Sequence, residues 1–459
     1  MTSNGKKRGK VGYIIVLLAI LGAVGYLYSA PEFEQEAPQI NIESEVFWNR
    51  KEPLRIEISD NRGLKSYEFI LTDGENTEIV DQQLFEGQDK EKEIFLKYPK
   101  KTTLNSKAKK LKLKITVNDN SKWNFLSGNM SQKMVNIEID YKRPRVTILA
   151  NSYMITQGGS ALVVFEAKDR NLADVYIKVG TKHFKVQPYK EDGFYAGLIA
   201  WEFNKKEFSA KIVAKDDAGN QRVADIPFYL KNKRYKVSWI RARDKFIDGK
   251  ITDLAENSDD YHNIEDRFER LKAINETMRL KNEELIHSLS EHVSSEILDG
   301  WKMKRFYPLR NAKRVASYGD ERHYYYKKRD NEISHSYHVG YDLASTQRAS
   351  IKSSNTGVVV YAEANGIYGN MPMIDHGLGL YTLYGHCSSL LVGVGDEVKV
   401  GQVIAKTGKS GLALGDHLHF GILVQGIEVR PVEWFDAGWI RKNIDNIFKK
   451  ANQMIKSEE

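Results

Sequence analysis

The chain has 459 residues, of which 41% are hydrophobic and 28% are charged. This composition is typical of a globular protein and excludes a mainly disordered one, and the length favours two to four domains. The 69 Lys and Arg residues exceed the 61 Asp and Glu residues, for a net charge of +8. That excess is compatible with a polyanionic partner, but no basic stripe with interleaved aromatic residues occurs, so no nucleic-acid partner is predicted.

Cysteine chemistry is almost absent from the chain, because Cys387 is the only cysteine. No intramolecular disulfide bond can form, and a four-cysteine zinc site is excluded as well. Any metal site must therefore be built from histidine and carboxylate side chains.

The N-terminus predicts a membrane anchor. Residues 11–30 carry no charge, and twenty helical residues at a rise of ~1.5 Å span about 30 Å, the thickness of a bilayer core. Basic residues precede this segment and acidic residues follow it. By the positive-inside rule, residues 1–10 are a cytoplasmic stub and everything after residue 30 lies outside. The alternative is a signal peptide cleaved near Ala30, which would export the chain equally well.

Two similar β-rich stretches follow. Apolar and polar residues alternate over residues 54–58 and 111–117, as in half-buried strands. The stretch that begins at Pro38 is echoed, about a hundred residues later, by the one that begins at Pro144, which fits tandem sandwich domains. We predict two Ig-like β-sandwich domains, at residues 38–143 and 144–231.

The next segment, residues 252–299, has a helical pattern. Its apolar residues recur at three-, four- and seven-residue steps: Ile264, Phe268, Leu271, Met278, Leu285 and Leu289. This spacing predicts an amphipathic helix or hairpin, which either packs on the next domain or mediates dimerisation. Glycine-rich short β-segments then predict a compact antiparallel β domain over residues 300–440. Residues 441–459 are expected to form a basic helix or tail.

Seven of the eleven histidines lie between residues 323 and 419. The first motif is His338-Val339-Gly340-Tyr341-Asp342. On a continuous strand, residues four apart are ~13 Å apart, too far to share a metal with ligand distances of about 2.0–2.2 Å. If His338 and Asp342 bind one metal, the chain must bend between them, and Gly340 permits that bend.

A second motif, Asp416-His417-Leu418-His419-Phe420, places both histidines on one face of a strand and Leu418 and Phe420 on the other. One imidazole can then bind a metal while the other reaches a bound water. A third motif, Tyr384-Gly385-His386-Cys387, places another histidine just after an apolar strand. Two histidines and one aspartate supply three ligands and leave a fourth position open, as in catalytic zinc sites.

In chain order the motifs are HxGxD, YGH and GxHLHF. They resemble the signature of peptidase family M23, the LytM and lysostaphin type of zinc peptidase that cuts peptide cross-links of peptidoglycan. The resemblance covers residues 300–440 and includes Ser317-Tyr318-Gly319, Gly395-Asp396 and Arg430-Pro431. It implies one Zn²⁺ per chain, and its ligands would be His338, Asp342 and His419. It also implies that His386 and His417 are the catalytic pair, one of which takes a proton from zinc-activated water.

Two features depart from the family pattern. Cys387 stands where a larger apolar residue is common, and we interpret it as a small hydrophobic residue. Residues 320–331 form a charged and aromatic insertion that is expected to be a loop near the groove. The other histidines of the region are interpreted as surface or supporting residues: His323, His335 and His376.

The resemblance implies that the partners are stem or cross-bridge peptides of peptidoglycan, with a divisome or envelope protein as a further candidate. The expected location is the bacterial inner (cytoplasmic) membrane, crossed once, with the catalytic domain facing the periplasm or cell wall. Two alternatives stay open: a non-catalytic regulator of another wall hydrolase, and an envelope scaffold. The bond that is cut, the roles of His386 and His417, and autoinhibition by residues 31–299 are also open.

Overall fold

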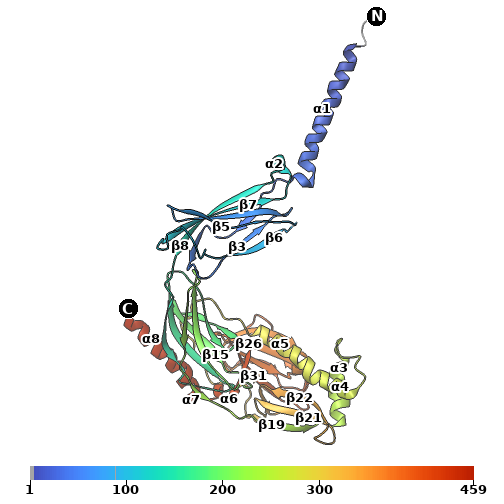
Figure 1. The fold of residues 1–459 in the computed structure, drawn as a ribbon. Helices are drawn as coiled ribbons and strands as arrows, with labels where there is room; N and C mark the ends of the chain where they lie inside the picture. The colour runs from blue at the N-terminus through green and yellow to red at the C-terminus, as the bar shows by residue number, and fades with distance from the viewer. Residues whose placement is uncertain (1–4, 88, 459) are drawn as a thin grey trace. The chain divides into compact units, whose positions relative to one another are not determined.

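The computed structural model describes residues 5–87 and 89–458. These residues form a mainly β protein (Figure 1), which confirms the predicted fold class. They divide into two compact units. The first contains residues up to Arg143 with the short stretches 170–173 and 215–221, and the second contains most of the remainder.

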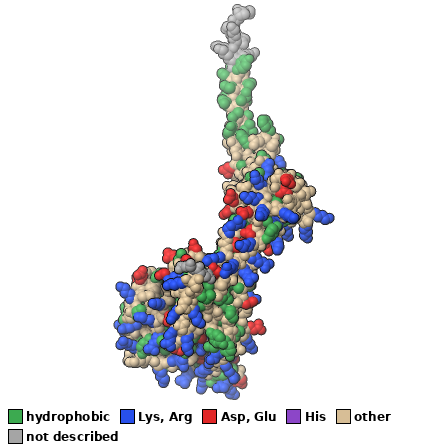
Figure 2. All heavy atoms as spheres, turned by 90° about the vertical axis from the view of Figure 1, so that its left-hand side faces the viewer, with side chains coloured by type: hydrophobic (Ala, Val, Ile, Leu, Met, Phe, Trp, Pro, Cys, Tyr) green, Lys and Arg blue, Asp and Glu red, His purple; other side chains and the backbone are tan. Residues whose placement is uncertain are grey.

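The N-terminal helix α1 spans Gly5–Ser29. Among the described residues it is the one helix long and apolar enough to cross a membrane, over Val11–Ser29. Its hydrophobic side chains are exposed along its length (Figure 2). An uncleaved anchor and a signal sequence both meet this criterion.

The first unit is built from a three-stranded sheet, β1-β3-β6, and a five-stranded sheet, β2-β8-β7-β4-β5. Inward-facing residues of both sheets share one core, in which Ile56, Phe69 and Leu113 are fully buried. Along β7 exposed and buried residues alternate as the sequence predicts. The strands are β1 (Gln39–Asn41), β2 (Glu45–Trp48), β3 (Leu54–Ser59), β4 (Leu64–Thr72), β5 (Thr77–Leu84), β6 (Glu91–Leu96), β7 (Lys110–Asp119) and β8 (Met130–Ile139), with the short helices η1 (Pro31–Phe33) and α2 (Trp123–Leu126).

A second pair of four-stranded sheets follows, ordered β14-β15-β11-β9 and β13-β12-β16-β17. The sheets approach closely at Gly197, where an added Cβ would lie 2.7 Å from a side-chain carbon of Ile177. The strands are β9 (Arg145–Asn151), β10 (Met154–Thr156), β11 (Ser160–Lys168), β12 (Leu172–Val179), β13 (Lys182–Lys185), β14 (Gln187–Tyr189), β15 (Glu191–Ala200), β16 (Ala210–Asp216), β17 (Gln221–Asp225) and β18 (Tyr229–Lys231).

The predicted amphipathic helix is present but starts later than Ile264. It runs without a break through α4 (Arg267–Lys272), η3 (Ala273–Met278) and α5 (Arg279–Leu289). Asp266 caps it by accepting hydrogen bonds from two backbone N–H groups of the first turn. A shorter helix, η2 (Phe246–Ile251) and α3 (Thr252–Glu256), precedes it. Leu271, Ile274 and Ile286 pack against strands of the C-terminal sheet, so this face of the helix covers that sheet.

The C-terminal region contains an eight-stranded sheet with the path β20-β23-β31-β27-β26-β25-β29, to which β32 is added at β31. Two three-stranded sheets flank it, β19-β21-β22 and β24-β30-β28. The strands are β19 (Val237–Arg241), β20 (Lys313–Ala316), β21 (Asp320–Tyr325), β22 (Glu332–His338), β23 (Tyr341–Ala344), β24 (Ser350–Lys352), β25 (Gly357–Ala364), β26 (Asn370–Asp375), β27 (Leu380–Gly385), β28 (Ser389–Leu390), β29 (Glu397–Val398), β30 (Val403–Lys406), β31 (Leu418–Val424) and β32 (Ile427–Val429), with the short helix η4 (Gly366–Tyr368).

The prediction of a loop near the groove at residues 320–331 was wrong for residues 320–325, although Arg322 and Tyr324 do line the groove. Residues 320–325 are strand β21, which forms a hairpin with β22 and lies parallel to β19. The ring of Trp239 on β19 stacks on that of His323 at 4.6 Å. The partner strand comes from about eighty residues earlier in the chain, so nothing local marks the insertion as a strand.

The chain ends in four short helical segments: α6 (Pro431–Trp434), α7 (Ala437–Ile440), η5 (Arg441–Asp445) and α8 (Asn446–Glu458). The α8 segment is packed rather than free. Its Phe448 ring lies 5.0 Å from the ring of Tyr189 on β14, and the Tyr189 hydroxyl donates a 2.7 Å hydrogen bond to Asn452.

Candidate metal centre and active-site groove

Three of the predicted site residues meet where strands β22, β23 and β31 lie together. His338 ends β22, and Asp342 follows on β23 after a break at residues 339–340, the bend that the sequence required. Asp342 pairs directly with His419 in the register of β23 and β31. The Oδ1 atom of Asp342 lies 2.9 Å from both His338 Nε2 and His419 Nδ1, and those two nitrogens are 3.1 Å apart.

The donor and acceptor roles of these atoms fit a metal ion. His338 Nδ1 is 3.0 Å from the carbonyl oxygen of Ser317, so it carries the proton and leaves a lone pair on Nε2. That lone pair points at a carboxylate that only accepts. In a tetrahedral zinc site each ligand atom lies about 2.1 Å from the metal, so two ligand atoms are ~3.4 Å apart. The distances among the atoms of His338, Asp342 and His419 are close to this value. A cation among the three atoms would convert this repulsion into coordination.

Electrostatics keep the same residues in the forms that bind metal. Burial by itself would raise the pKa of Asp342, but the neighbouring imidazoles of His338 and His419 hold that pKa well below its usual range. Burial lowers the pKa of His419 to about 4. Near neutral pH, Asp342 is therefore ionised and His419 is neutral, as ligands to zinc must be.

The two remaining predicted histidines face the same groove. The rings of His386 and His417 are 4.8 Å apart, and both line the cavity with the three residues above. His386 Nδ1 is 2.9 Å from the Ser410 carbonyl oxygen, and His417 Nδ1 is 2.8 Å from that of Gly415. Each Nδ1–H is thus engaged, which leaves Nε2 to exchange a proton.

His386 is held neutral. Burial, followed by the nearby charges of His419 and His417, keeps its pKa well below the usual range for histidine. The Nε2 atom of His417 lies 3.7 Å from Asp342 Oδ1. Both histidines are therefore placed to exchange a proton in the groove.

Cys387, His376 and the hairpin histidines lie outside this group. Cys387 is fully buried, its thiol donates to the Tyr384 carbonyl, and burial raises its pKa to about 12, so it is a neutral packing residue. His376 is buried between Thr356 and Thr382. His323 and His335 lie near Glu321, close enough for a metal, but each imidazole already has a carboxylate partner.

The groove has a volume of about 930 Å³. The loop around residues 409–414 forms one wall, and residues 240–253 form the other. This second wall was missed by the sequence interpretation. Its basic cluster, residues 241–245, is visible in the sequence, but nothing local locates it beside His338, about a hundred residues further on.

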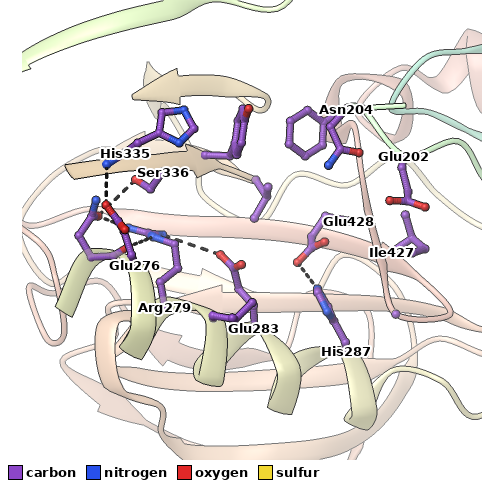
Figure 3. A pocket seen from close by; sticks show the side chains of 16 residues that line it. Glu202, Asn204, Glu276, Arg279, Glu283, His287, His335, Ser336, Ile427 and Glu428 are labelled. Atoms are coloured by element: carbon purple, nitrogen blue, oxygen red, sulfur yellow. Dashed lines mark hydrogen bonds and ion pairs between the residues drawn. The ribbon is translucent and has the colours of Figure 1, made fainter. Parts of the chain in front are cut away.

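A second cavity, of about 600 Å³, is lined along one side by residues of α5 (Figure 3). Arg279 lines both cavities. Burial raises the pKa of Glu283, and the Tyr368 hydroxyl donates to this residue across 3.4 Å. The Tyr368 ring packs on His419 at 5.4 Å, so the helix supports one of the predicted ligands through Tyr368.

Residues 336–431 match the model of Peptidase family M23. These residues form an M23 peptidase domain. All five predicted site residues fall within it, and the resemblance seen in the sequence is confirmed. Residues 240–253 and helix α5, which complete the groove and its support, lie outside the matched segment.

Several curated relatives share the M23 domain. The DD-carboxypeptidase/endopeptidase Mpg of Neisseria meningitidis is 38% identical over 95 residues, which cover 21% of this chain and 22% of Mpg. The murein hydrolase activator EnvC of Escherichia coli is 36% identical over 21% of this chain and 23% of EnvC. The chain thus spans less than a quarter of these two relatives. Among solved structures, the catalytic domain of lysostaphin from Staphylococcus simulans is 27% identical over 27% of this chain and 92% of that domain, with a TM-score of 0.23.

Proposed function

We propose that this chain is a zinc-dependent endopeptidase that hydrolyses peptide cross-links of peptidoglycan. The convergence of His338, Asp342 and His419 carries the proposal, because all three ligand atoms lie within 3.1 Å of one another. Two histidines and one carboxylate, with a position left open, are the ligand set of hydrolytic zinc sites. Structural zinc sites, by contrast, use four protein ligands.

A zinc ion held by these residues would supply Lewis acidity and bring the pKa of a water molecule close to neutrality. The neutral His386 accepts a proton at Nε2 and later returns it to the leaving amine. His417, on the same side of the groove, stabilises negative charge on the peptide carbonyl oxygen when it is protonated. The carbonyl groups of Ser410 and Gly415 hold both imidazoles in the orientation that these roles need.

The proposed location follows from helix α1. With the basic residues at its start in the cytoplasm, the helix anchors the chain in the bacterial inner membrane and leaves the M23 domain on the outer side. Peptidoglycan stem and cross-bridge peptides are then the accessible substrates. A relative named as a peptidoglycan DD-endopeptidase, ShyA of Vibrio cholerae, is 37% identical over 100 residues and supports this substrate class.

A regulator without activity is the competing function, because EnvC is named as an activator of murein hydrolases. The presence of three ligand residues and two further histidines in one groove favours an enzyme. The two functions differ in whether the chain itself opens cross-links.

Digestion of isolated sacculi by the purified full chain, followed by mass spectrometry of the released muropeptides, tests the proposal. We expect cross-linked dimers to decrease and uncross-linked products to increase. Chelation should abolish this activity and added Zn²⁺ should restore it. His338→Ala should lose bound zinc and activity together, whereas His262→Ala, at an exposed histidine outside the groove, should keep both. A zinc-loaded wild-type chain that leaves every cross-link intact would refute the proposal.

A further inference from the structure

The wall formed by residues 240–253 is attached to the metal centre by backbone pairing. Strand β19 lies parallel to β21, with Ile240 opposite Tyr324, and β21 pairs with β22, which ends at His338. Each strand thus sets the position of the next through its hydrogen bonds. The wall therefore stands in a defined place beside the metal centre.

The groove is strongly basic. Two carboxylates line it, Asp253 and Asp342, and Asp342 belongs to the metal centre. Seven cationic side chains line the same groove: Arg241, Arg243, Lys245, Lys250, Arg279, Arg322 and Lys409. A bound divalent metal would add to this excess, and a concave surface of one sign attracts ligands of the opposite charge.

Two of these cations have carboxylate partners. Arg322 lies 3.3 Å from Asp320, and Arg279 lies 3.9 Å from Glu283. The others have no carboxylate within 4 Å among residues 5–87 and 89–458. We call these five residues the basic wall, although Lys409 belongs to the loop on the other side of the groove: Arg241, Arg243, Lys245, Lys250 and Lys409.

Charge is segregated within the segment itself. Asp244 and Asp248, which alternate with the basic residues along the chain, both form 2.8 Å ion pairs with Arg267 on α4. Neither aspartate lines the groove. The acidic side chains are therefore bound elsewhere, and they are not available to neutralise the basic wall.

Two lysines of the basic wall meet across the groove. Lys250 Nζ donates a 2.9 Å hydrogen bond to the backbone carbonyl oxygen of Lys409. Burial and the charge of Lys409 both lower the pKa of Lys250, against the opposing effect of Asp253. The ammonium group of Lys250 is partly buried and has no carboxylate within 4 Å among the described residues, which raises the free energy of the empty groove. An anion bound beside Lys250 and Lys409 would lower it.

We propose that the basic wall is an anion subsite that binds a free carboxylate of the peptide substrate next to the scissile bond. The inference rests on the proposed function, and it narrows the substrate to stem peptides whose carboxylates are not amidated. Ammonium and guanidinium groups form charge-assisted hydrogen bonds with a carboxylate. A neutral carboxamide at the same place would leave the lysine pair without a counter-charge.

The test compares two cross-linked muropeptides that differ only in one stem-peptide carboxylate, which is free in one and amidated in the other. A charge-assisted hydrogen bond is worth about 1.5–3 kcal/mol, so we expect a kcat/KM about 10–100-fold higher for the free form. The preference should fall as salt rises. In the double variant Lys250→Gln/Lys409→Gln, kcat/KM for the free form should fall by about the same factor, and that for the amidated form should change little.

Three controls distinguish a loss of carboxylate recognition from a general disturbance of the folded structure. The exposed Lys399→Gln should keep the preference, and Lys250→Arg/Lys409→Arg should retain most of it because the charges remain. Zinc content and thermal unfolding of the Gln variant should match those of the wild type. Equal cleavage of both peptides by the wild type, or an equal loss for both peptides in the Gln variant, would overturn the subsite.

A binding measurement tests the anion subsite independently of the proposed peptidase activity. The zinc-loaded variant His386→Asn should bind the free peptide more tightly than the amidated one by calorimetry. If the wild type cleaves neither peptide, the proposed function fails, and a remaining difference in affinity still supports the subsite. Equal affinities would overturn it.

Discussion

The carboxylate of Glu433 accepts a 3.2 Å hydrogen bond from the backbone N–H of Ser160, which lies more than 270 residues earlier in the chain. Next to it, Trp434 Nε1 donates to the Ser160 hydroxyl across 3.1 Å. Glu433 also lies 3.5 Å from Arg430. A buried polar contact thus joins strand β11 of the second sandwich to helix α6, directly after the M23 domain.

This contact predicts a pH-dependent stability. Burial raises the pKa of Glu433 to about 7, above the usual value near 4.3 of an unfolded chain. Between these two values the folded state binds more protons, so its stability should fall as pH rises through about 7. The difference approaches roughly 3 kcal/mol. Urea unfolding at pH 5 and pH 8 should show this loss in the wild type and a smaller loss in Glu433→Gln; equal losses would contradict the prediction.

Trp434 should be a main source of stability for the same contact. Its side chain is fully buried and packs against Trp301, Phe306 and Trp439. Trp434→Ala should lower the free energy of unfolding by about 3–5 kcal/mol through the cavity it leaves. Val432→Ala, at a neighbouring residue that is 38% exposed, should change it by less than about 1.5 kcal/mol. Denaturant titration of both variants checks the difference.

Gly340 should be required for metal affinity. An added Cβ would lie 2.6 Å from His419 Nε2 and 2.7 Å from Cε1, closer than real side chains approach. Gly340→Ala should therefore displace His419 and weaken zinc binding about 10–100-fold, like other changes that disturb a ligand's orientation. Gly300→Ala, where an added Cβ meets nothing within 4 Å, is the control. Unchanged zinc affinity in a competitive chelator titration would refute the prediction.

The two histidines outside the metal centre should affect turnover without affecting metal content. His386 has a φ of 65°, which asparagine tolerates better than alanine does. His386→Asn and His417→Asn should each lower kcat about 10²–10⁴-fold. Both should retain zinc, measured by mass spectrometry of the metal. Loss of zinc in either variant would show that the substituted histidine is a metal ligand, contrary to the prediction.

The local sequence was enough to predict two strands of the first unit, β3 and β7. The alternation along residues 110–119 is a period-2 pattern, and it appears unchanged as the buried face of β7. The bend at Gly340 followed from the reach of two side chains four residues apart. Both inferences use geometry that acts over a few residues.

The order of the motifs also predicted that His386 and His417 lie in one groove, because members of the family that the motifs resemble share one three-dimensional arrangement. The resemblance ends at the limits of the M23 domain. It contained nothing about the hairpin at residues 320–331, which pairs with β19, or about helix α5, which reaches His419 through Tyr368.

The sequence by itself determined the candidate residues for holding a metal and moving protons, since its motifs resemble those of family M23. Only the tertiary structure decided what surrounds them. The pairing of β19 with β21 turns a short basic stretch, Arg241 to Lys245, into a wall of the groove. The packing of Glu433 against Ser160 joins two parts of the chain that no local pattern relates. Such contacts form because distant segments bury their surfaces together, and that burial leaves no signal in either segment alone.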